Sequence, residues 1–326
     1  MVYIIINSYW DFFNRDIESS LKKISLSNND TIKILKIKWK NKENLFGKIK
    51  RYICFKLKKI KWILDCTEIE KEKFSKNDYV IFFDVYEDYY LNLIRNKTSN
   101  SKEIFWLWNK IDHNYIYNLK KISKNIWSFD KKEAEETKIN YSSQFYWHQK
   151  EEPVKEEYDI YFIGQDKGRE KRILDLKEHL SNWKFKIKII LKKYTKEIFK
   201  YISKNKKERE NYSLKNIAYE EVIEDIKKSK VILELTKKNQ AGLTLRALEA
   251  LFYEKKLITD NENIKEYDFY DSNNIFILKQ DEELSAKKKK ELEDFLRKDF
   301  KIVSKEVKKQ YTIENWLEKL IKYYIQ

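Results

Sequence analysis

The chain has 326 residues, of which 42% are hydrophobic and 37% are charged, and it carries a formal net charge of +16. This composition predicts a globular protein with room for two domains of ordinary size rather than a disordered chain. No run of about 18 apolar residues is present, the opening strand VYIIIN is too short for a signal peptide, and two cysteines give neither a disulfide framework nor metal-ligand spacing. We therefore expect a reduced, cytoplasmic protein without a membrane-spanning helix.

Strand-like and helix-like segments alternate along the whole chain, which is typical of α/β layers. The strands predicted in the first half are 2–7, 31–37, 79–84, 103–107, 125–128 and 145–147. The helices predicted there are 11–24, a basic helical region after residue 37, 89–96 and 131–137.

The segment EEPVKEEYD, residues 151–159, holds the only proline and five acidic residues, and it predicts an interdomain linker. The strands predicted after it are 159–163, 185–191, 231–235, 256–259 and 275–278. The helices predicted there are 171–179, 220–229, 243–253, 287–299 and 313–324.

This order predicts an N-terminal domain over residues 1–150, a linker over 151–158 and a C-terminal domain over 159–326. The last helix is free to pack back on the N-terminal domain. We expect an α/β protein of two Rossmann-like domains that face each other across a cleft, because ligands bind at the carboxyl edges of open α/β sheets.

A basic segment lies between Lys33 and Lys61, with twelve Lys or Arg residues and one acidic residue. Such a charge attracts phosphates of nucleic acid or of an anionic membrane. Aromatic and aliphatic residues interrupt it, and it lacks zinc-finger spacing and an aromatic ribonucleoprotein motif, so we expect it to contact lipid headgroups. Solvated lysines, which are frequent in chains with an AT-rich coding bias, are the alternative. The residues expected to face the membrane are Lys56, Lys58, Lys59 and Lys61.

Two loops of the second half have the features of phosphate sites. In GQDKGRE, residues 164–170, two glycines follow a strand and precede a helix, and Lys167 and Arg169 supply cations. In GLTLR, residues 242–246, a glycine precedes an apolar helix whose N-terminal N–H groups suit a phosphate. Neither loop fits a P-loop or a GxGxxG fingerprint, which argues against an ATPase or a dehydrogenase. An ordinary αβ unit is the alternative.

Glu249 lies on the second turn of the predicted helix, seven positions after Gly242 and among apolar neighbours. A carboxylate that faces a core is costly unless it is hydrogen-bonded. The paired hydroxyls of a ribose would satisfy it. The alternative is an acid on the helix surface.

Several segments of the second half resemble bacterial GT-B glycosyltransferases of the lipopolysaccharide core or capsule biosynthesis type: the strand–GQDKGR–helix unit, AYEEVIEDIKKSKVILEL, QAGLTLRALEALFYEKKLITDN and IKEYDFYDSNNIFIL. In the first half, IFWLWNKI, IWSFDKKEAEE and INYSSQFYW resemble the same group. The resemblance covers nearly the whole chain and is strongest from Asp159 to Leu278.

The resemblance implies a nucleotide-sugar donor held by the C-terminal domain. Glu249 matches the acidic residue that these enzymes place on the donor ribose, and residues 242–245 match the turn at the diphosphate. Lys167 and Arg169 match cations on that diphosphate, and Tyr219 and Glu220 lie near the loop that flanks the nucleobase. The residues expected to bind the donor are Gly164, Lys167, Arg169, Tyr219, Gly242, Leu243, Thr244, Arg246 and Glu249.

One position departs from the family pattern. Many retaining members carry a second glutamate eight positions before the one matched by Glu249, and here that position is Ala241, next to Gln240. The departure leaves the stereochemistry open and favours inversion.

An inverting transfer needs a base that removes the proton of the acceptor hydroxyl, and we expect it in the N-terminal domain. Asp11 and Asp84, which follow predicted strands, are the catalytic candidates. Asp84 is equally compatible with a cap for a helix that begins at Val85. Asp112, His113 and His148 are further candidates for the base.

No DxD motif is present, although Asp84 and Asp88 are close in sequence. We expect neither a metal nor another cofactor, with helix N-termini and cations stabilising the diphosphate. The expected function is a sugar transfer to a cell-surface glycan or a lipid-linked precursor, by an enzyme held peripherally at the inner face of the membrane. The alternative is a nucleic-acid-binding protein, or a DNA-modifying glycosyltransferase, that uses the basic segment.

Overall fold

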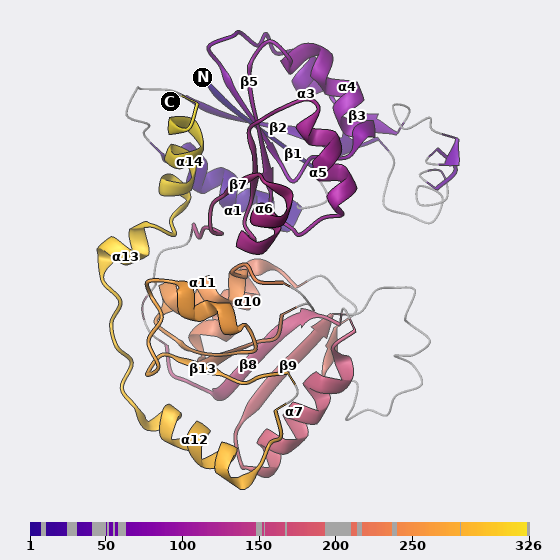
Figure 1. The fold of residues 1–326 in the computed structure, drawn as a ribbon. Coiled ribbons are helices and arrows are strands. Elements are labelled where there is room, and N and C mark those ends of the chain that lie inside the picture. Colours follow the sequence, from indigo (N-terminus) through magenta and orange to yellow (C-terminus); the bar gives the residue numbers. More distant parts are fainter. Residues whose placement is uncertain are drawn as a thin grey trace. The chain divides into compact units, whose positions relative to one another are not determined.

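The computed structural model describes residues 1–7, 11–24, 31–40, 50, 52–54, 56–57, 63–147, 152, 154–166, 168–192, 210–213, 217–236, 240–280 and 282–324. The chain divides into two compact units (Figure 1). Unit 1 comprises Met1–Trp147 and Thr312–Gln326, and unit 2 comprises His148–Tyr311.

Unit 1 is built on a seven-stranded sheet in the order β3-β2-β1-β4-β5-β6-β7. Its strands are β1 (Val2–Asn7), β2 (Ile32–Trp39), β3 (Leu64–Asp65), β4 (Tyr79–Phe83), β5 (Lys102–Leu107), β6 (Ile126–Ser128) and β7 (Asn140–Tyr141). All neighbours pair in parallel except β2 and β3. The central strands β1 and β4 are buried along their whole length, which explains their continuous apolar runs.

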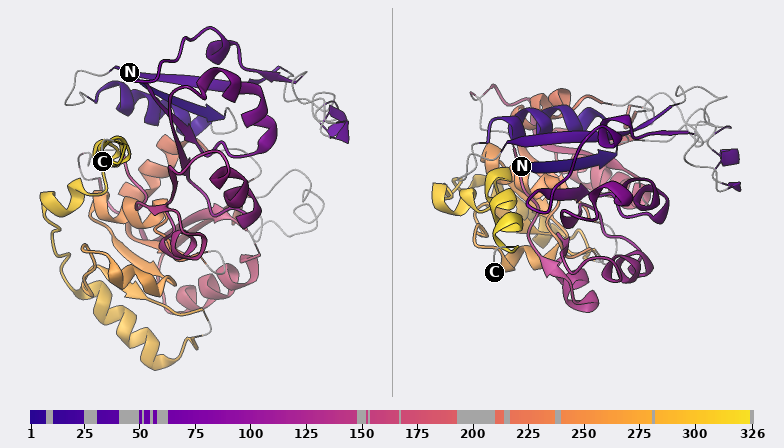
Figure 2. Two further views of the ribbon diagram at one scale, coloured as in Figure 1. Left: turned by 45° about the horizontal axis from the view of Figure 1, so that its top comes forward. Right: turned by 90° about the horizontal axis from the view of Figure 1, so that it is seen from above.

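Helices cover both faces of this sheet. They are α1 (Asp11–Lys22), α3 (Thr67–Glu70), α4 (Asp88–Thr98), α5 (His113–Lys120), α6 (Lys131–Thr137) and α14 (Ile313–Lys322). Residues of α3, α4 and α5 share one apolar core with the strands. Helix α14, drawn in yellow, lies beside α1, drawn in indigo (Figure 2), and the two helices are in contact.

Helix α14 completes the core of unit 1. Its Trp316 is 2% exposed, and its ring centroid lies 4.4 Å from that of Phe145, 5.5 Å from Trp106 and 6.0 Å from Phe83. The strand predicted over 145–147 is wrong, because in the described part of the chain Tyr146 makes only an isolated bridge to Thr312. This apolar run is a core-filling segment and not part of the sheet.

Unit 2 is built on a six-stranded parallel sheet in the order β10-β9-β8-β11-β12-β13. Its strands are β8 (Tyr158–Gln165), β9 (Ile187–Lys192), β10 (Tyr212–Ser213), β11 (Ser229–Glu234), β12 (Lys256–Thr259) and β13 (Ile275–Ile277). Its helices are α7 (Glu170–Asn182), α10 (Tyr219–Lys227), α11 (Leu245–Tyr253), α12 (Ala286–Arg297), α13 (Lys305–Lys309) and the 3₁₀ helix η4 (Glu262–Glu266). Figure 1 shows α7 and α12 on one face of the sheet and α10 and α11 on the other.

Counted from β8, the strand order of unit 2 is 3-2-1-4-5-6, which is the Rossmann order. Unit 1 has the same reversal between β1 and β4. The predicted α/β fold with two Rossmann-like domains is therefore confirmed. A cleft between the two domains stays a prediction.

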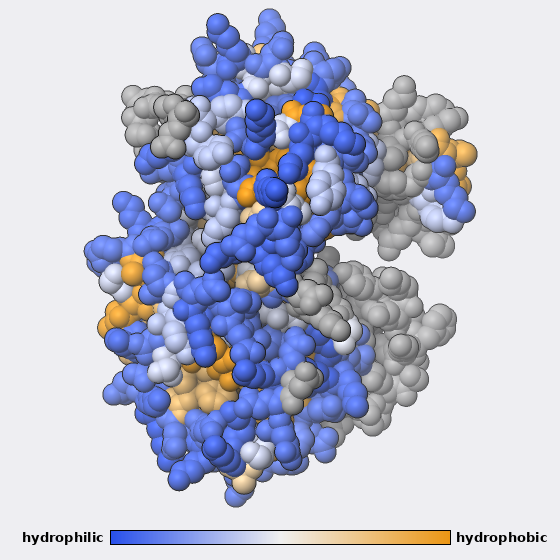
Figure 3. Space-filling model, in the orientation of Figure 1, coloured by the Kyte–Doolittle hydropathy of each residue, from blue (hydrophilic) through white to orange (hydrophobic). Residues whose placement is uncertain are grey.

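None of the helices that the structure describes is long and apolar enough to cross a membrane. Hydrophilic residues cover most of the face shown in Figure 3, and apolar residues reach that surface in small patches.

Candidate active site

The carboxyl ends of β8, β11 and β12 define the candidate site of unit 2. The strand order reverses between β8 and β11, and ligands of open α/β sheets bind outside the strand ends at such a reversal. Strand β8 ends at Gln165, β11 at Glu234 and β12 at Thr259. Both predicted phosphate loops lie at this edge. The loop at 164–170 is at the end of β8, and the loop at 242–246 leads into α11.

Glu234 is the central carboxylate of this edge, and sequence reasoning missed it. It is 1% exposed and accepts hydrogen bonds from the hydroxyls of Thr244 and Thr259. Burial raises its pKa, and the two hydroxyls oppose that rise. The available signal was the single acid in the otherwise apolar strand VILEL.

Asp260 is a second buried carboxylate that the sequence did not single out. Its Oδ1 accepts from the backbone N–H and the hydroxyl of Thr236, at 2.7 and 2.9 Å. Its Oδ2 pairs with Arg172 of α7 at 2.5 Å and accepts from Gln280 at 3.3 Å. Asp260, at the end of β12, therefore connects this strand by hydrogen bonds to the loop after β11 and by an ion pair to the first turn of α7.

The loop after β8 is held in place by Arg169. Its guanidinium donates to the carbonyls of Gln165, at 2.8 Å, and Asp166, at 3.3 Å. A Cβ atom at Gly164 would approach the Phe162 ring to 3.1 Å, and Gly168 has a φ of +81°, so both positions favour glycine. Burial lowers the pKa of Arg169, whereas Asp260, Asp166 and Glu234 raise it, so its positive charge lies among three carboxylates. Lys167 lies outside the described residues.

The second loop leads into α11, which begins at Leu245, slightly later than predicted. Thr244 is its N-cap, and the Thr244 hydroxyl accepts from the backbone N–H of Arg246 at 3.0 Å. Leu243 is fully buried, next to Gly242. The same Thr244 hydroxyl donates to Glu234, so this loop and the end of β11 are joined at one hydroxyl group.

Glu249 is fully buried, which rules out the alternative of an acid on the helix surface. Its Oε1 accepts from the hydroxyl of Tyr219 at 2.8 Å, and its Oε2 pairs with Arg246 one turn earlier on α11. Burial raises the pKa of Glu249 to about 7, against the opposing effects of Arg246 and Tyr219. The structure thus brings together Tyr219, Arg246 and Glu249, which the sequence grouped as donor-binding residues.

Asp84 lies at the corresponding edge of unit 1, directly after β4. Its Oδ1 accepts from the backbone N–H groups of Trp108 and Asn109, at 3.1 and 3.3 Å, and its Oδ2 accepts from the Asn109 side chain at 3.0 Å. Its φ of +53° is in the left-handed region, where aspartate is tolerated better than most residues. Burial raises its pKa to about 6. The cap hypothesis was wrong, because α4 begins at Asp88 and its N-cap is Glu87.

Of the other candidates for the base, two make contacts that belong to the fold, and two have side chains outside the described residues. Asp112 is the N-cap of α5, a helix that the sequence reading missed, and His113 lies 3.9 Å from Glu136. His148 and the side chain of Asp11 lie outside the described residues, although the backbone of Asp11 begins α1.

The basic segment has less unpaired charge than its composition indicated. Three of its lysines lie on β2 and pair with acids outside the segment: Lys33 with Glu72, Lys36 with Glu18, and Lys38 with Glu68. Beyond β2, Tyr52 is 61% exposed and Leu57 58% exposed, and the Lys56 ammonium lies 5.0 Å from the Tyr52 ring centroid. Lys58, Lys59 and Lys61 lie outside the described residues.

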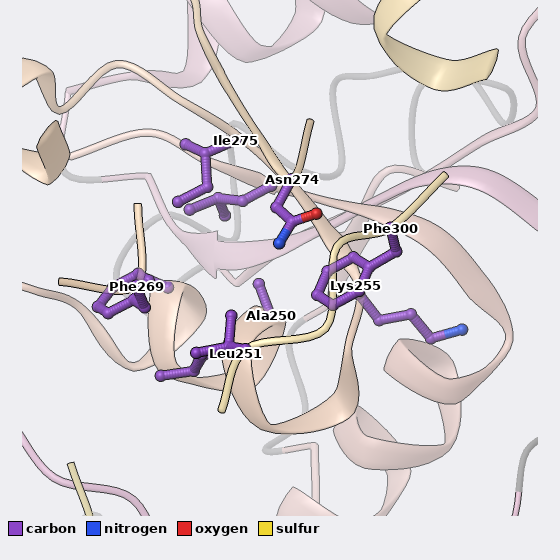
Figure 4. Close-up of a pocket in the computed structure, with 10 residues that line it drawn as sticks. Ala250, Leu251, Lys255, Phe269, Asn274, Ile275 and Phe300 are labelled. Carbon is purple, nitrogen blue, oxygen red and sulfur yellow. The ribbon is translucent and has the colours of Figure 1, made fainter. Parts of the chain in front are cut away.

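A small apolar cavity of about 10 Å³ lies between α11 and the amino ends of β12 and β13 (Figure 4). Ala250 and Leu251 of α11 line it, together with Phe269 and Ile275. It has room for at most about one water molecule and lies at the opposite edge of the sheet from Glu234. It is therefore separate from the candidate site. In the part of the chain that the structure describes, no group of three or more His, Cys, Asp or Glu side chains is arranged to hold a metal ion.

No known family model matches the chain, and no curated protein matches its sequence. Solved structures match its fold. A glycosyltransferase from Rickettsia africae has a TM-score of 0.56 at 12% identity, over 99% of this chain and 97% of that one. An alpha-glucosyltransferase in complex with UDP and a 13-mer DNA has a TM-score of 0.55 at 12% identity, over 100% and 99% of the two chains.

Sucrose-phosphate synthase from Thermosynechococcus elongatus has a TM-score of 0.54 at 11% identity, over 100% of this chain and 98% of that one. Identities this low establish the fold and nothing further. All three matches extend over both units of this chain. The protein therefore has the GT-B fold, the architecture of two Rossmann-like domains that these glycosyltransferases share.

Proposed function

We propose that the protein is a glycosyltransferase that moves a sugar from a nucleotide-sugar donor to a cell-surface glycan or a lipid-linked precursor, of the lipopolysaccharide or capsule type. The observation that carries the sugar transfer is the GT-B likeness over the full length of both domains. The type of acceptor is proposed from the sequence resemblance alone. The edge of unit 2 supports it, because a parallel sheet with a strand-order reversal presents two helix-leading loops there.

Unit 2 binds the donor in this proposal. Glu249 accepts the ribose hydroxyls, because each oxygen of a carboxylate can accept a further hydrogen bond beside those from Tyr219 and Arg246. Arg246, which pairs with this carboxylate, contacts the donor beside Glu249. Tyr219 lies beside the nucleobase.

The diphosphate contacts the loops at 164–169 and 242–246 in this proposal. Arg169 and Lys167 provide the positive charge, and the turn at Gly242 and Leu243 lets the backbone approach the phosphates. No metal takes part, so these groups stabilise the charge that builds on the departing diphosphate.

Unit 1 supplies the acceptor side. Asp84 is the proposed base of an inverting transfer, because a pKa of about 6 allows a carboxylate to be ionised at neutral pH and still accept a proton. Its three hydrogen bonds fix the direction of the carboxylate. Asp11 remains a second candidate for this role.

The exposed side chains of Tyr52, Ile53, Lys56 and Leu57 form the proposed contact with an anionic membrane at its cytoplasmic face. Figure 3 shows hydrophobic and hydrophilic surface side by side there, at the far right. Replacing Lys56, Lys58, Lys59 and Lys61 by Gln should reduce binding to phosphatidylserine vesicles, and added salt should have the same effect. Equal binding to neutral vesicles would contradict this contact.

Nucleic-acid binding is not favoured. The lysines of β2 are already paired with carboxylates, which leaves less charge for a phosphate backbone.

The proposed function is tested by thermal unfolding in the presence of UDP-, GDP-, CMP- and ADP-sugars. A donor at about 100 times its dissociation constant should stabilise the protein by roughly 2.7 kcal/mol. The variant Glu249→Ala should respond less, and Glu221→Ala, which removes an exposed acid of α10, should respond as the wild type does. A wild-type protein that responds to none of these sugars would refute the proposal.

A further inference from the structure

Glu234 has no part in the proposed donor binding, although it lies at the centre of the edge to which that proposal assigns the donor. It is the last residue of β11 and is 1% exposed, so its carboxylate does not face a ligand directly. A negative charge that met a diphosphate would also repel it. The position of Glu234 therefore has to be explained by the contacts that its carboxylate makes inside the protein.

The first contact leads to one end of the turn at 241–244. The Thr244 hydroxyl donates to Oε1 of Glu234 and accepts from the backbone N–H of Arg246. Because the hydroxyl oxygen already accepts that N–H, its single proton is available for Glu234. Thr244 is also the N-cap of α11, so the carboxylate fixes the point at which the turn enters the helix.

The second contact leads to the other end of the same turn. The Thr259 hydroxyl donates to Oε2 of Glu234 and accepts from the backbone N–H of Asn261 at 3.0 Å. The side-chain amide of Asn261 donates to the carbonyl of Ala241 at 3.2 Å. Thr259 is fully buried and Asn261 is 3% exposed, so these hydrogen bonds are shielded from water. Glu234 is thus connected to both ends of the turn, directly at one end and through two residues at the other.

The middle of the turn is held as well. Leu243 is fully buried, and Gly242 is buried beside it. With both ends connected to Glu234 and its middle packed, the turn keeps its backbone in one arrangement. Oriented backbone N–H groups bind an anion, and a preformed site binds it without the entropic cost of ordering the loop.

We propose that Glu234 is a positioning residue for the donor: through Thr244 and Thr259 it holds the turn at 241–244 in the conformation that binds the diphosphate. This inference rests on the proposed sugar transfer and deepens the description of the same site. It explains why an acid lies next to a site for an anion, because a carboxylate accepts from both hydroxyls at once. A glutamine has a single acceptor oxygen, so Glu234→Gln leaves one of the two hydroxyls without its acceptor.

The test is calorimetry of the full chain with UDP, GDP and ADP. The wild type should bind at least one of these nucleoside diphosphates, and Glu234→Gln should bind it about tenfold more weakly, because a turn that is in its binding conformation for only about a tenth of the time weakens the apparent affinity by the same factor. The control Glu133→Gln changes an equally enclosed carboxylate of unit 1, which accepts from Ser128 and Ile111. It should bind as the wild type does.

Two variants of Thr259 test the longer connection and decide the matter if Glu234→Gln does not fold. Valine keeps the size of threonine without its hydroxyl, and serine keeps the hydroxyl. Thr259→Val should weaken binding of the diphosphate several-fold, and Thr259→Ser should stay within about twofold of the wild type, because serine still connects Glu234 to Asn261.

The affinity of the folded protein separates positioning from a structural role. A structural role alone would lower the free energy of unfolding, measured with urea, and leave the affinity unchanged. Unchanged affinity in either folded variant, Glu234→Gln or Thr259→Val, would therefore overturn this inference and leave the proposed function standing. Equal weakening by Glu133→Gln would also overturn it, because the loss would not come from the turn.

The wild type distinguishes this inference from the proposed function. A wild type that responds to a nucleotide sugar but binds none of the three diphosphates would refute this inference alone. A wild type that responds to neither would refute the proposed function and this inference with it.

Discussion

The fully buried Glu249 makes the stability of unit 2 depend on pH. Burial raises its pKa from an ordinary 4.5 to about 7, so the folded protein keeps this proton over a range in which the unfolded chain has lost it. The stability that the bound proton contributes is therefore fully present below about pH 4.5. It is lost as the pH rises from there through about 7.

The magnitude follows from the two pKa values. At about 1.4 kcal/mol per pKa unit, the interval from 4.5 to about 7 corresponds to roughly 3 kcal/mol in total. Between about pH 5.5 and pH 8 the wild type should lose roughly 2 kcal/mol of this contribution. The variant Glu249→Gln has no carboxylate at this position and should not lose it.

The measurement is urea unfolding, followed by circular dichroism, at about pH 5.5 and pH 8. Comparing the pH-dependent loss of the wild type with that of Glu249→Gln cancels the contribution of every other titrating group. Glu220→Gln, an exposed position on α10, is the matched control and should behave as the wild type. A difference below about 0.5 kcal/mol between wild type and Glu249→Gln would refute the reasoning, because Glu249 would then titrate as an exposed acid.

Three further predictions concern single residues. Sugar transfer by the wild type should rise with pH through about 6, as Asp84 loses its proton, and Asp84→Asn should abolish that dependence and lower turnover in a rate assay. Lys256→Met should lower the free energy of unfolding by about 1–3 kcal/mol, measured by urea unfolding, because the buried ammonium donates to the carbonyls of Phe295 and Lys298 at the end of α12. Arg169→Lys should weaken donor binding about tenfold in calorimetry, because lysine keeps the charge but loses the planar fork; unchanged affinity would argue against a diphosphate contact.

The alternation of strands and helices could be predicted from the sequence. Most of the helices bury one apolar stripe, most of the strands are continuous apolar runs, and both patterns are visible in the sequence. Helix α5 was predictable in principle and was missed. Asp112 is an ordinary N-cap, and Ile116 and Leu119 are spaced three apart on its buried face.

The buried carboxylates were not predictable in the same way. Glu234 and Asp260 are satisfied by threonines and an arginine that are distant in sequence and meet them only at the edge of the sheet. Asp84 was misread as a possible cap because its partners are also distant in sequence. Its carboxylate accepts from the backbone N–H groups of Trp108 and Asn109, which follow the neighbouring strand β5, and not from the helix after it. Glu249 was identifiable from its apolar neighbours, although its pairing with Tyr219 required the structure.

Helix α14 has a consequence for the order in which the two units fold during synthesis. The chain leaves unit 1 after Trp147 and re-enters it at Thr312, where Tyr146 and Thr312 form a bridge and the Tyr146 carbonyl accepts from the backbone N–H of Ile313. During synthesis, unit 2 can fold as soon as it leaves the ribosome. The N-terminal unit has to wait, because Trp316 belongs to its core. A fragment of residues 148–311 should accumulate as folded protein, whereas a fragment of residues 1–147 leaves an uncovered aromatic surface and depends on chaperones until α14 is supplied.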